Sequence, residues 1–163
     1  MSTEVNCGQV RGPIQLSFSR SIDRIVSSEH AITRTSVTNE KERTMGHKFT
    51  VPYGLYKAQG FVNPFLAKQT GFSADDLELL FTALENAFQF DQSAARPAGS
   101  MAPEPSSSSS TTPPSATPPS HKLFELVTVK KKTDVEVPRA FTDYDLTVDD
   151  ANLPAGVTLH RRI

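Results

Sequence analysis

The residues of this chain that most often catalyse reactions or bind metals are four histidines, one cysteine and two pairs of adjacent aspartates. The histidines stand far apart in the sequence, and no two have the spacing of paired metal ligands; they are His30, His47, His121 and His160. No nucleophile elbow, P-loop or dinucleotide-binding glycine pattern is present. We therefore expect no catalytic residue, no resident metal and no cofactor, and a protein that is not an enzyme.

The aspartate pairs and the cysteine have simpler interpretations than catalysis. Asp75-Asp76 begins a predicted helix, whose positive end acidic side chains stabilise, and Asp149-Asp150 falls in a predicted turn. Cys7 is the only cysteine, so one copy of the chain cannot form a disulfide or a cysteine metal site. Cys7 lies near His30 only in the linear sequence, which does not support a nucleophilic pair.

Binding is the chemistry that remains, and the basic residues indicate where it would occur. Residues 1–60 hold eight Lys and Arg against five Asp and Glu, whereas residues 61–100 hold two against five, although the net charge is −1. The cations of the first sixty residues are Arg11, Arg20, Arg24, Arg34, Lys41, Arg43, Lys48 and Lys57. Three aromatic residues follow closely: Tyr53, Tyr56 and Phe61.

A basic groove beside aromatic residues of a sheet is typical of single-stranded RNA binding, because cations neutralise phosphates while rings support bases. The alternative is a solvated charged face with the aromatic residues in the core. Composition alone favours that alternative.

Alternating apolar and polar residues predict that most of these cations stand on extended chain. Residues 9–20 are predicted to form a strand that is buried on one side. Its apolar face consists of Ile14, Leu16 and Phe18. Residues 20–48 are polar and rich in Ser and Thr, which favours a long inserted ribbon with a solvated tip at residues 39–43. A second strand is predicted at residues 49–61, and the residues that weaken its middle are Pro52 and Gly54.

Two helices are predicted after these strands. Asn63-Pro64 has the pattern of an N-cap followed by a first-turn proline, and Gly71 ends this short helix. A longer helix at about residues 74–90 begins with a capping-box variant at residues 73–76. Its apolar face consists of Leu77, Leu80, Phe81, Leu84, Ala87 and Phe88, and we expect this face to pack on a sheet.

The rest of the chain divides into a linker and a second folded block. Residues 97–120 hold seven of the twelve prolines and a run of five serines, which predicts a disordered linker between blocks 1–96 and 121–163. The second block is predicted to contain a short helix at 121–126 and strands at 127–132, 144–148 and 157–163. Strands, a helix and further strands predict an α+β fold, with an antiparallel sheet and one main helix.

Eight runs of the chain follow, in order, the pattern of one protein family. They are VRGPIQ (10–15), SRSID (19–23), EHAITR (29–34), RTMGHK (43–48), VPYGLYKAQGF (51–61), DDLEL (75–79), HKLFELV (121–127) and NLPAGV (152–157). Together they resemble the C-terminal half of the multi-copy backbone subunit of type I-C CRISPR surveillance complexes, known as Cascade. The resemblance covers both predicted blocks.

This resemblance implies a ferredoxin-like, RRM-like palm with an inserted ribbon, and no nuclease activity. Copies would stack along the guide RNA, display its bases for pairing with target DNA, and contact other Cascade subunits in antiviral defence. Phosphate contacts are implied for Arg11, Arg20, Arg24 and Arg34. The resemblance also implies RNA contacts where the ribbon returns, at Thr44, Met45 and Lys48. Met45 is either an apolar wedge in the guide or a buried anchor for the base of the ribbon.

The chain also departs from this family in two places. The family's N-terminal half would precede Met1, and the family has an apolar strand where this chain has residues 97–120. We therefore expect a truncated subunit with an internal low-complexity replacement, which alone is marginally stable and prone to associate. The alternative to RNA binding is a degenerate fragment that only docks on intact subunits.

The sequence gives no sign of membrane insertion. No apolar stretch approaches the length of a membrane span, and no signal peptide opens the chain. We expect a cytoplasmic protein without a membrane partner.

Overall fold

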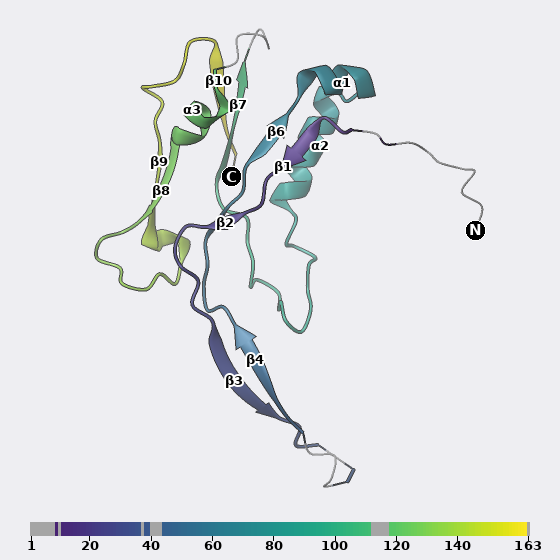
Figure 1. Ribbon diagram of the computed structural model, residues 1–163, viewed down its shortest axis with the longest axis vertical. Coiled ribbons are helices and arrows are strands. Elements are labelled where there is room, and N and C mark those ends of the chain that lie inside the picture. The colour runs from purple at the N-terminus through teal and green to yellow at the C-terminus, as the bar shows by residue number, and fades with distance from the viewer. Residues whose placement is uncertain (1–8, 10, 37, 40–43, 112–117, 163) are drawn as a thin grey trace, which may run out of the picture. The chain divides into compact units, whose positions relative to one another are not determined.

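A computed structural model of the chain describes residues 9, 11–36, 38–39, 44–111 and 118–162 (Figure 1). The chain divides into two compact units. Unit 1 draws on residues 1–18, 58–126 and 149–163, and unit 2 draws on residues 19–57 and 127–148. Each unit therefore combines residues from both sides of the predicted linker.

Unit 1 contains three helices and two antiparallel strand pairs among its described residues. Its elements are β1 (Ile14–Leu16), β6 (Gly60–Val62), α1 (Pro64–Thr70), α2 (Ala74–Glu85), β7 (Ser106–Thr111), α3 (Ser120–Glu125) and β10 (Val157–Arg162). Strand β1 pairs with β6, with Ile14 opposite Val62, and β7 pairs with β10, with Thr111 opposite Val157. Leu126 and Val157 are its most buried apolar residues.

The two predicted helix starts are confirmed by their hydrogen bonds. Asn63 Oδ1 accepts the backbone N–H groups of Phe65 at 2.9 Å and Leu66 at 3.2 Å, at the start of α1. Gly71 ends α1 in the left-handed region with φ of 75°, which a residue with a Cβ rarely adopts. The two bonds to Asn63 satisfy N–H groups that the first turn of a helix leaves without partners.

Helix α2 begins as predicted and ends earlier than predicted. The backbone N–H of Asp76 donates to Ser73 Oγ at 3.1 Å, and the backbone N–H of Ser73 donates to Asp76 Oδ2 at 2.8 Å. The helix ends at Glu85, about five residues before its expected end. The Asn86 side-chain amide donates to the carbonyl of Thr82 at 2.8 Å, and the following bonds tighten to three-residue steps. Asn86 thus ends the helix by competing for its last carbonyls.

The predicted disordered linker contains a strand. Ser106–Thr111 form β7, which pairs with β10 over six residue pairs. Ser110 Oγ also lies 3.2 Å from His160 Nε2 on the neighbouring strand. The serine run is therefore stabilised as a strand by cross-strand hydrogen bonds. Its composition alone does not predict this strand, because the partner residues lie about fifty positions away in the sequence. The expectation of disorder is wrong for residues 106–111, while residues 112–117 lie outside the described chain.

Unit 2 contains three antiparallel strand pairs among its described residues. Its elements are β2 (Arg20–Ser21), β3 (Ser28–Thr33), β4 (Met45–Thr50), β5 (Tyr56–Lys57), β8 (Val127–Lys131), the 3-10 helix η3 (Phe141–Asp143) and β9 (Tyr144–Val148). Strand β2 pairs with β5, β3 with β4, and β8 with β9. Tyr144, at the start of β9, is 5% exposed and is the most buried side chain of this unit.

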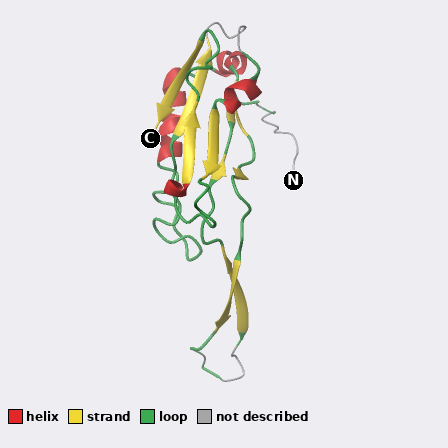
Figure 2. Ribbon diagram, turned by 90° about the vertical axis from the view of Figure 1, so that its left-hand side faces the viewer, coloured by secondary structure: helices red, strands yellow, loops and turns green. Residues whose placement is uncertain are grey.

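The α+β class is confirmed, because helices and antiparallel strands both occur (Figure 2). The described strands form two-stranded pairs, and they do not join into the single sheet that we expected. Two predicted strands are also shorter. Strand β1 stops at Leu16, and Phe18, expected on a buried face, is 96% exposed. The predicted strand at 49–61 is interrupted around Pro52 and Gly54, where weakness was predicted.

Among the described residues, none of the helices has the length and apolar character needed to cross a membrane.

Candidate nucleic-acid interface

In the segment predicted as a long ribbon at residues 20–48, the structure has the antiparallel pair of β3 and β4, which reaches Thr50 (Figure 1). Its register places Ser28 opposite Thr50 and Thr33 opposite Met45. The pairing continues one step further, where the backbone N–H of Arg34 donates to the carbonyl of Thr44 at 3.1 Å. Residues 40–43, which include most of the predicted tip, lie outside the described chain.

The register separates the ribbon's side chains into two faces, since opposite residues share a face and successive residues alternate. One face, here called the Arg34 face, consists of Ser28, His30, Ile32, Arg34, Thr44, Gly46, Lys48 and Thr50. Three of the seven predicted site residues lie on it: Arg34, Thr44 and Lys48. None of the eight residues of this face is acidic. His30 Nε2 lies 3.2 Å from Thr50 Oγ1 on the same face.

The opposite face, here called the Met45 face, has a different chemical character. It consists of Glu29, Ala31, Thr33, Met45, His47 and Phe49. The acid on this face is paired, because Glu29 Oε1 lies 2.7 Å from His47 Nδ1. Met45 is 78% exposed and Phe49 is 65% exposed, so this face presents apolar surface to solvent. The ribbon therefore carries two cations on one face, and a paired acid with two exposed apolar side chains on the other.

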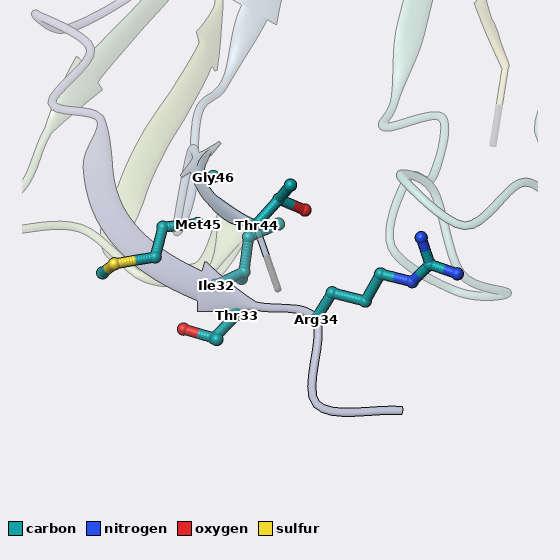
Figure 3. A pocket seen from close by; sticks show the side chains of 6 residues that line it. All are labelled: Ile32, Thr33, Arg34, Thr44, Met45 and Gly46. Carbon is teal, nitrogen blue, oxygen red and sulfur yellow. The ribbon is translucent and has the colours of Figure 1, made fainter. Parts of the chain in front are cut away.

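A shallow hollow of about 290 Å³ lies where β3 ends and β4 begins. Its lining residues are Ile32, Thr33, Arg34, Thr44, Met45 and Gly46. Figure 3 shows Met45 and Thr33 pointing to one side of the ribbon and Arg34 to the other. Gly46 lies beside Ile32, and a Cβ on Gly46 would lie 3.5 Å from Ile32 Cγ1. The hollow is open, which suits one edge of an extended polymer better than an enclosed small molecule.

The remaining predicted site residues lie away from the ribbon. Arg20 stands opposite Lys57 in the pair of β2 and β5, and Arg24 follows β2 in a loop; both are exposed. Arg11 is also exposed, but it belongs to unit 1. Lys57 Nζ donates to the carbonyl of Val127 at 2.7 Å, and burial lowers the pKa of Lys57. Lys57 therefore has a structural hydrogen bond.

The aromatic residues that the sequence places in one row do not form one surface. Tyr53 is half-buried against Tyr144, with ring centroids 6.3 Å apart, in unit 2. Phe61 makes an edge-to-face contact with Phe124 at 5.3 Å, in unit 1. Tyr56 is exposed on β5. Packing therefore accounts for Tyr53, whereas Phe61 makes its ring contact and is still exposed.

Within the described residues, no group of three or more His, Cys, Asp and Glu is arranged to hold a metal ion. The aspartate pairs have the local roles that were predicted. Asp76 caps α2, and Asp149 accepts hydrogen bonds from the backbone N–H and the side-chain amide of Asn152 in a turn. Hydrogen bonds from Asn152 lower the pKa of Asp149.

A family model described as CRISPR-associated protein Cas7 matches residues 1–149. The chain belongs to the Cas7 family. The match includes the whole range of unit 2, and therefore the β3–β4 ribbon. Membership makes the chain a kind of backbone subunit of the multi-subunit CRISPR complexes that carry out RNA-guided defence. A comparison with curated proteins gives no match.

For this Cas7 family member, the structure removes one of the two roles left open for Met45. A buried anchor for the base of the ribbon needs a side chain enclosed by neighbours, whereas Met45 projects into solvent from the Met45 face. The anchor interpretation is therefore wrong for the described chain. The wedge interpretation stays a prediction.

Sequence reasoning missed one residue of the Cas7 ribbon. His30 shares the Arg34 face with two cations, and it stands opposite Lys48. The two-residue alternation of Ser28, His30, Ile32 and Arg34 was a signal for this face. The pairing of His30 with Lys48 could not be predicted from the sequence, because it depends on how many residues the turn between β3 and β4 contains.

Proposed function

We propose that this chain is a guide-RNA-binding structural subunit of a type I-C CRISPR surveillance complex, and that it is not an enzyme. The observation that supports RNA binding is the Arg34 face of the ribbon. Arg34 and Lys48 lie on one side of a two-stranded element, Thr44 stands opposite Arg34, and the described residues of this face include no acid. Such a face attracts a phosphate backbone and does not repel it.

The proposed contacts divide between the two ribbon faces. The Arg34 face neutralises phosphates, and the hydroxyl of Thr44 is a further donor to a phosphate oxygen. The Met45 face offers apolar surface to bases, which suits a ribbon inserted beside single-stranded RNA. Arg20 and Arg24 add exposed cations from the same unit. Target DNA is then a partner through base pairing with the guide, and other copies and other Cascade subunits complete the assembly.

The test measures binding of the full chain to single-stranded RNA across a range of salt concentrations. Arg34→Ala and Lys48→Ala each remove one proposed phosphate contact. Each variant should lower the slope of log affinity against log salt by about 0.7, and weaken binding about fourfold near 0.15 M salt. Lys68→Ala is the matched control, because Lys68 is an exposed cation on α1 in unit 1. Unchanged slopes for both ribbon variants would overturn the assignment.

A second control separates the two faces of the ribbon. Glu29→Gln removes the acid of the Met45 face and leaves the Arg34 face unaltered. If phosphates lie on the Arg34 face, this variant should leave the salt slope unchanged. If the whole chain binds no RNA but binds intact Cas7 subunits, the docking-only alternative replaces our proposal.

The subtype is tested separately. Co-expression with the other subunits of a type I-C complex and its guide should yield a complex that contains this chain and intact RNA. Cleavage of the guide by the chain alone would contradict the structural role. The expectation that the chain supplies only part of such a subunit stays a prediction.

A further inference from the structure

His30 lies among the cations on the Arg34 face of the ribbon. It is exposed, and it stands directly opposite Lys48 in the register of β3 and β4. Opposite residues on one face of a strand pair have their Cβ atoms about 5 Å apart. Arg34 follows on the same face four residues along the chain, or about 13 Å away on extended backbone. An imidazole ring is therefore placed beside one exposed cation and in line with another.

Thr50 orients the His30 ring. The Nε2 atom of His30 lies 3.2 Å from Thr50 Oγ1, and Thr50 is diagonally opposite on the same face. A neutral imidazole has one donor nitrogen and one acceptor nitrogen, whereas an imidazolium has two donors. In the imidazolium form, Nε2 donates to the Thr50 hydroxyl and Nδ1 becomes a second donor. An oxygen of a phosphate can accept that second hydrogen bond.

The charges around His30 favour an anion as its partner. The charged residues on its own face are Lys48 from β4 and Arg34 from the end of β3, and none of the eight residues of this face is acidic. The adjacent carboxylate in the sequence, Glu29, lies on the Met45 face and is paired with His47. A protonated ring and Lys48 repel each other, and a phosphate bound between them would offset this repulsion. Protonation of His30 and phosphate binding should therefore reinforce each other.

We propose that His30 is a third phosphate contact on the Arg34 face, which it makes as an imidazolium whose ring is positioned by Thr50. Histidine is the side chain whose charge ordinarily changes between about pH 5 and pH 8. RNA binding by this chain should therefore strengthen as the pH falls through that range. This inference rests on the proposed function, and it adds a dependence of the same site on pH.

The test measures binding of the full chain to an oligouridylate without terminal phosphates, at about pH 5.5 and about pH 8, across a range of salt concentrations. Uracil takes up no proton in this range, so the charge of the probe does not change. The unmodified chain should bind about fourfold more tightly at the lower pH, with a salt slope steeper by about 0.7. His30→Gln should abolish both changes and should bind like the unmodified chain at the higher pH. His47→Gln is the matched control, because it removes a histidine from the opposite face and should keep both changes.

Thr50→Val and Thr50→Ser test the positioning role. Thr50→Val keeps the branched shape and removes the hydroxyl, so it should weaken binding at the lower pH and leave binding at the higher pH unaltered. Thr50→Ser keeps a hydroxyl and should behave like the unmodified chain. Equal weakening by Thr50→Val at both pH values would show that Thr50 only supports the ribbon, and the positioning role would be overturned.

The outcomes separate this inference from the proposed function. If the unmodified chain binds equally well at both pH values, or if His30→Gln keeps the gain at the lower pH, His30 is not a phosphate contact and this inference fails. The proposed function stands in that case if Arg34→Ala and Lys48→Ala still lower the salt slope. If the unmodified chain binds no RNA at either pH, both proposals fail.

Discussion

The guanidinium of Arg162 in β10 lies over the ring of Phe81 in α2, with 4.3 Å between Arg162 Cζ and the ring centroid. The same guanidinium hydrogen-bonds to Glu78 and Glu85 on that helix. The hydrogen bond that Arg162 donates to Glu78 is the main cause that raises the pKa of Arg162. One side chain therefore connects the main helix of unit 1 to its last strand, through a cation–π contact and two carboxylates.

Replacing Arg162 should destabilise unit 1 more than replacing its neighbour Arg161. Arg162→Ala leaves Glu78 and Glu85 without their common partner and removes the contact with Phe81, so the free energy of unfolding should fall. Arg161→Ala removes an exposed ion pair with Asp150, which contributes at most about 1 kcal/mol. Denaturant unfolding of both variants checks the order. Equal losses would show that the connection between β10 and α2 contributes little.

Replacing Met45 should separate folding from RNA binding. Because Met45 is 78% exposed, Met45→Ala should change the free energy of unfolding by less than about 0.5 kcal/mol. If Met45 is an apolar wedge between bases, the same variant should weaken RNA binding about fivefold, or roughly 1 kcal/mol. Met101→Ala, which replaces an exposed methionine of unit 1, is the control for Met45 of unit 2. A Met45→Ala chain that binds RNA normally would remove the wedge role.

The features that could be predicted from the sequence are those that depend on near neighbours. The caps at Asn63 and Ser73 and the stop at Gly71 each involve residues within a few positions, so their residue types were sufficient evidence. The ribbon could be predicted because a long polar segment rich in Ser and Thr favours extended chain. The interruption around Pro52 and Gly54 could also be predicted, because proline and glycine themselves weaken a strand.

The features that could not be predicted depend on distant partners. The strand at 106–111 exists because β10 pairs with it, and nothing near the serine run announces that partner. The separation of Arg34 and Met45 onto opposite faces required the register between β3 and β4. Alternating patterns indicate a face, but only pairing shows which strands share it.

Acidification should weaken the start of helix α2. Backbone and side-chain hydrogen bonds from Ser73 lower the pKa of Asp76 below its usual 3.8. The stability that this carboxylate contributes is therefore present above about pH 4 and is lost as the pH falls through the lowered pKa. Asp76→Asn should reduce the loss of stability between about pH 5 and pH 2, measured by thermal melting.

Two variants in the same turn serve as controls for this cap. Ser73→Ala removes the partner hydroxyl and should cost about 1 kcal/mol at neutral pH. Asp75→Asn changes an adjacent carboxylate that is outside the capping box, so it should leave more of the acid-induced loss in place than Asp76→Asn does. If Asp75→Asn and Asp76→Asn behave alike, the helix start gains only from nearby negative charge and not from the cap itself.

Alkaline pH should report on Tyr144, because burial, and then the hydrogen bond and negative charge of Asp23, raise its pKa above the ordinary value of 10. The folded state thus keeps this proton where the unfolded state loses it. Stability from Tyr144 is complete below about pH 10 and falls as the pH rises beyond it. Tyr144→Phe should remove that part of the alkaline loss of stability, as measured by denaturant unfolding, whereas Tyr56→Phe should not.

Tyrosinate absorbance should also show one of the three tyrosines ionising last, and that step should disappear in Tyr144→Phe. A late ionisation that survives in Tyr144→Phe would show that another tyrosine has the raised pKa.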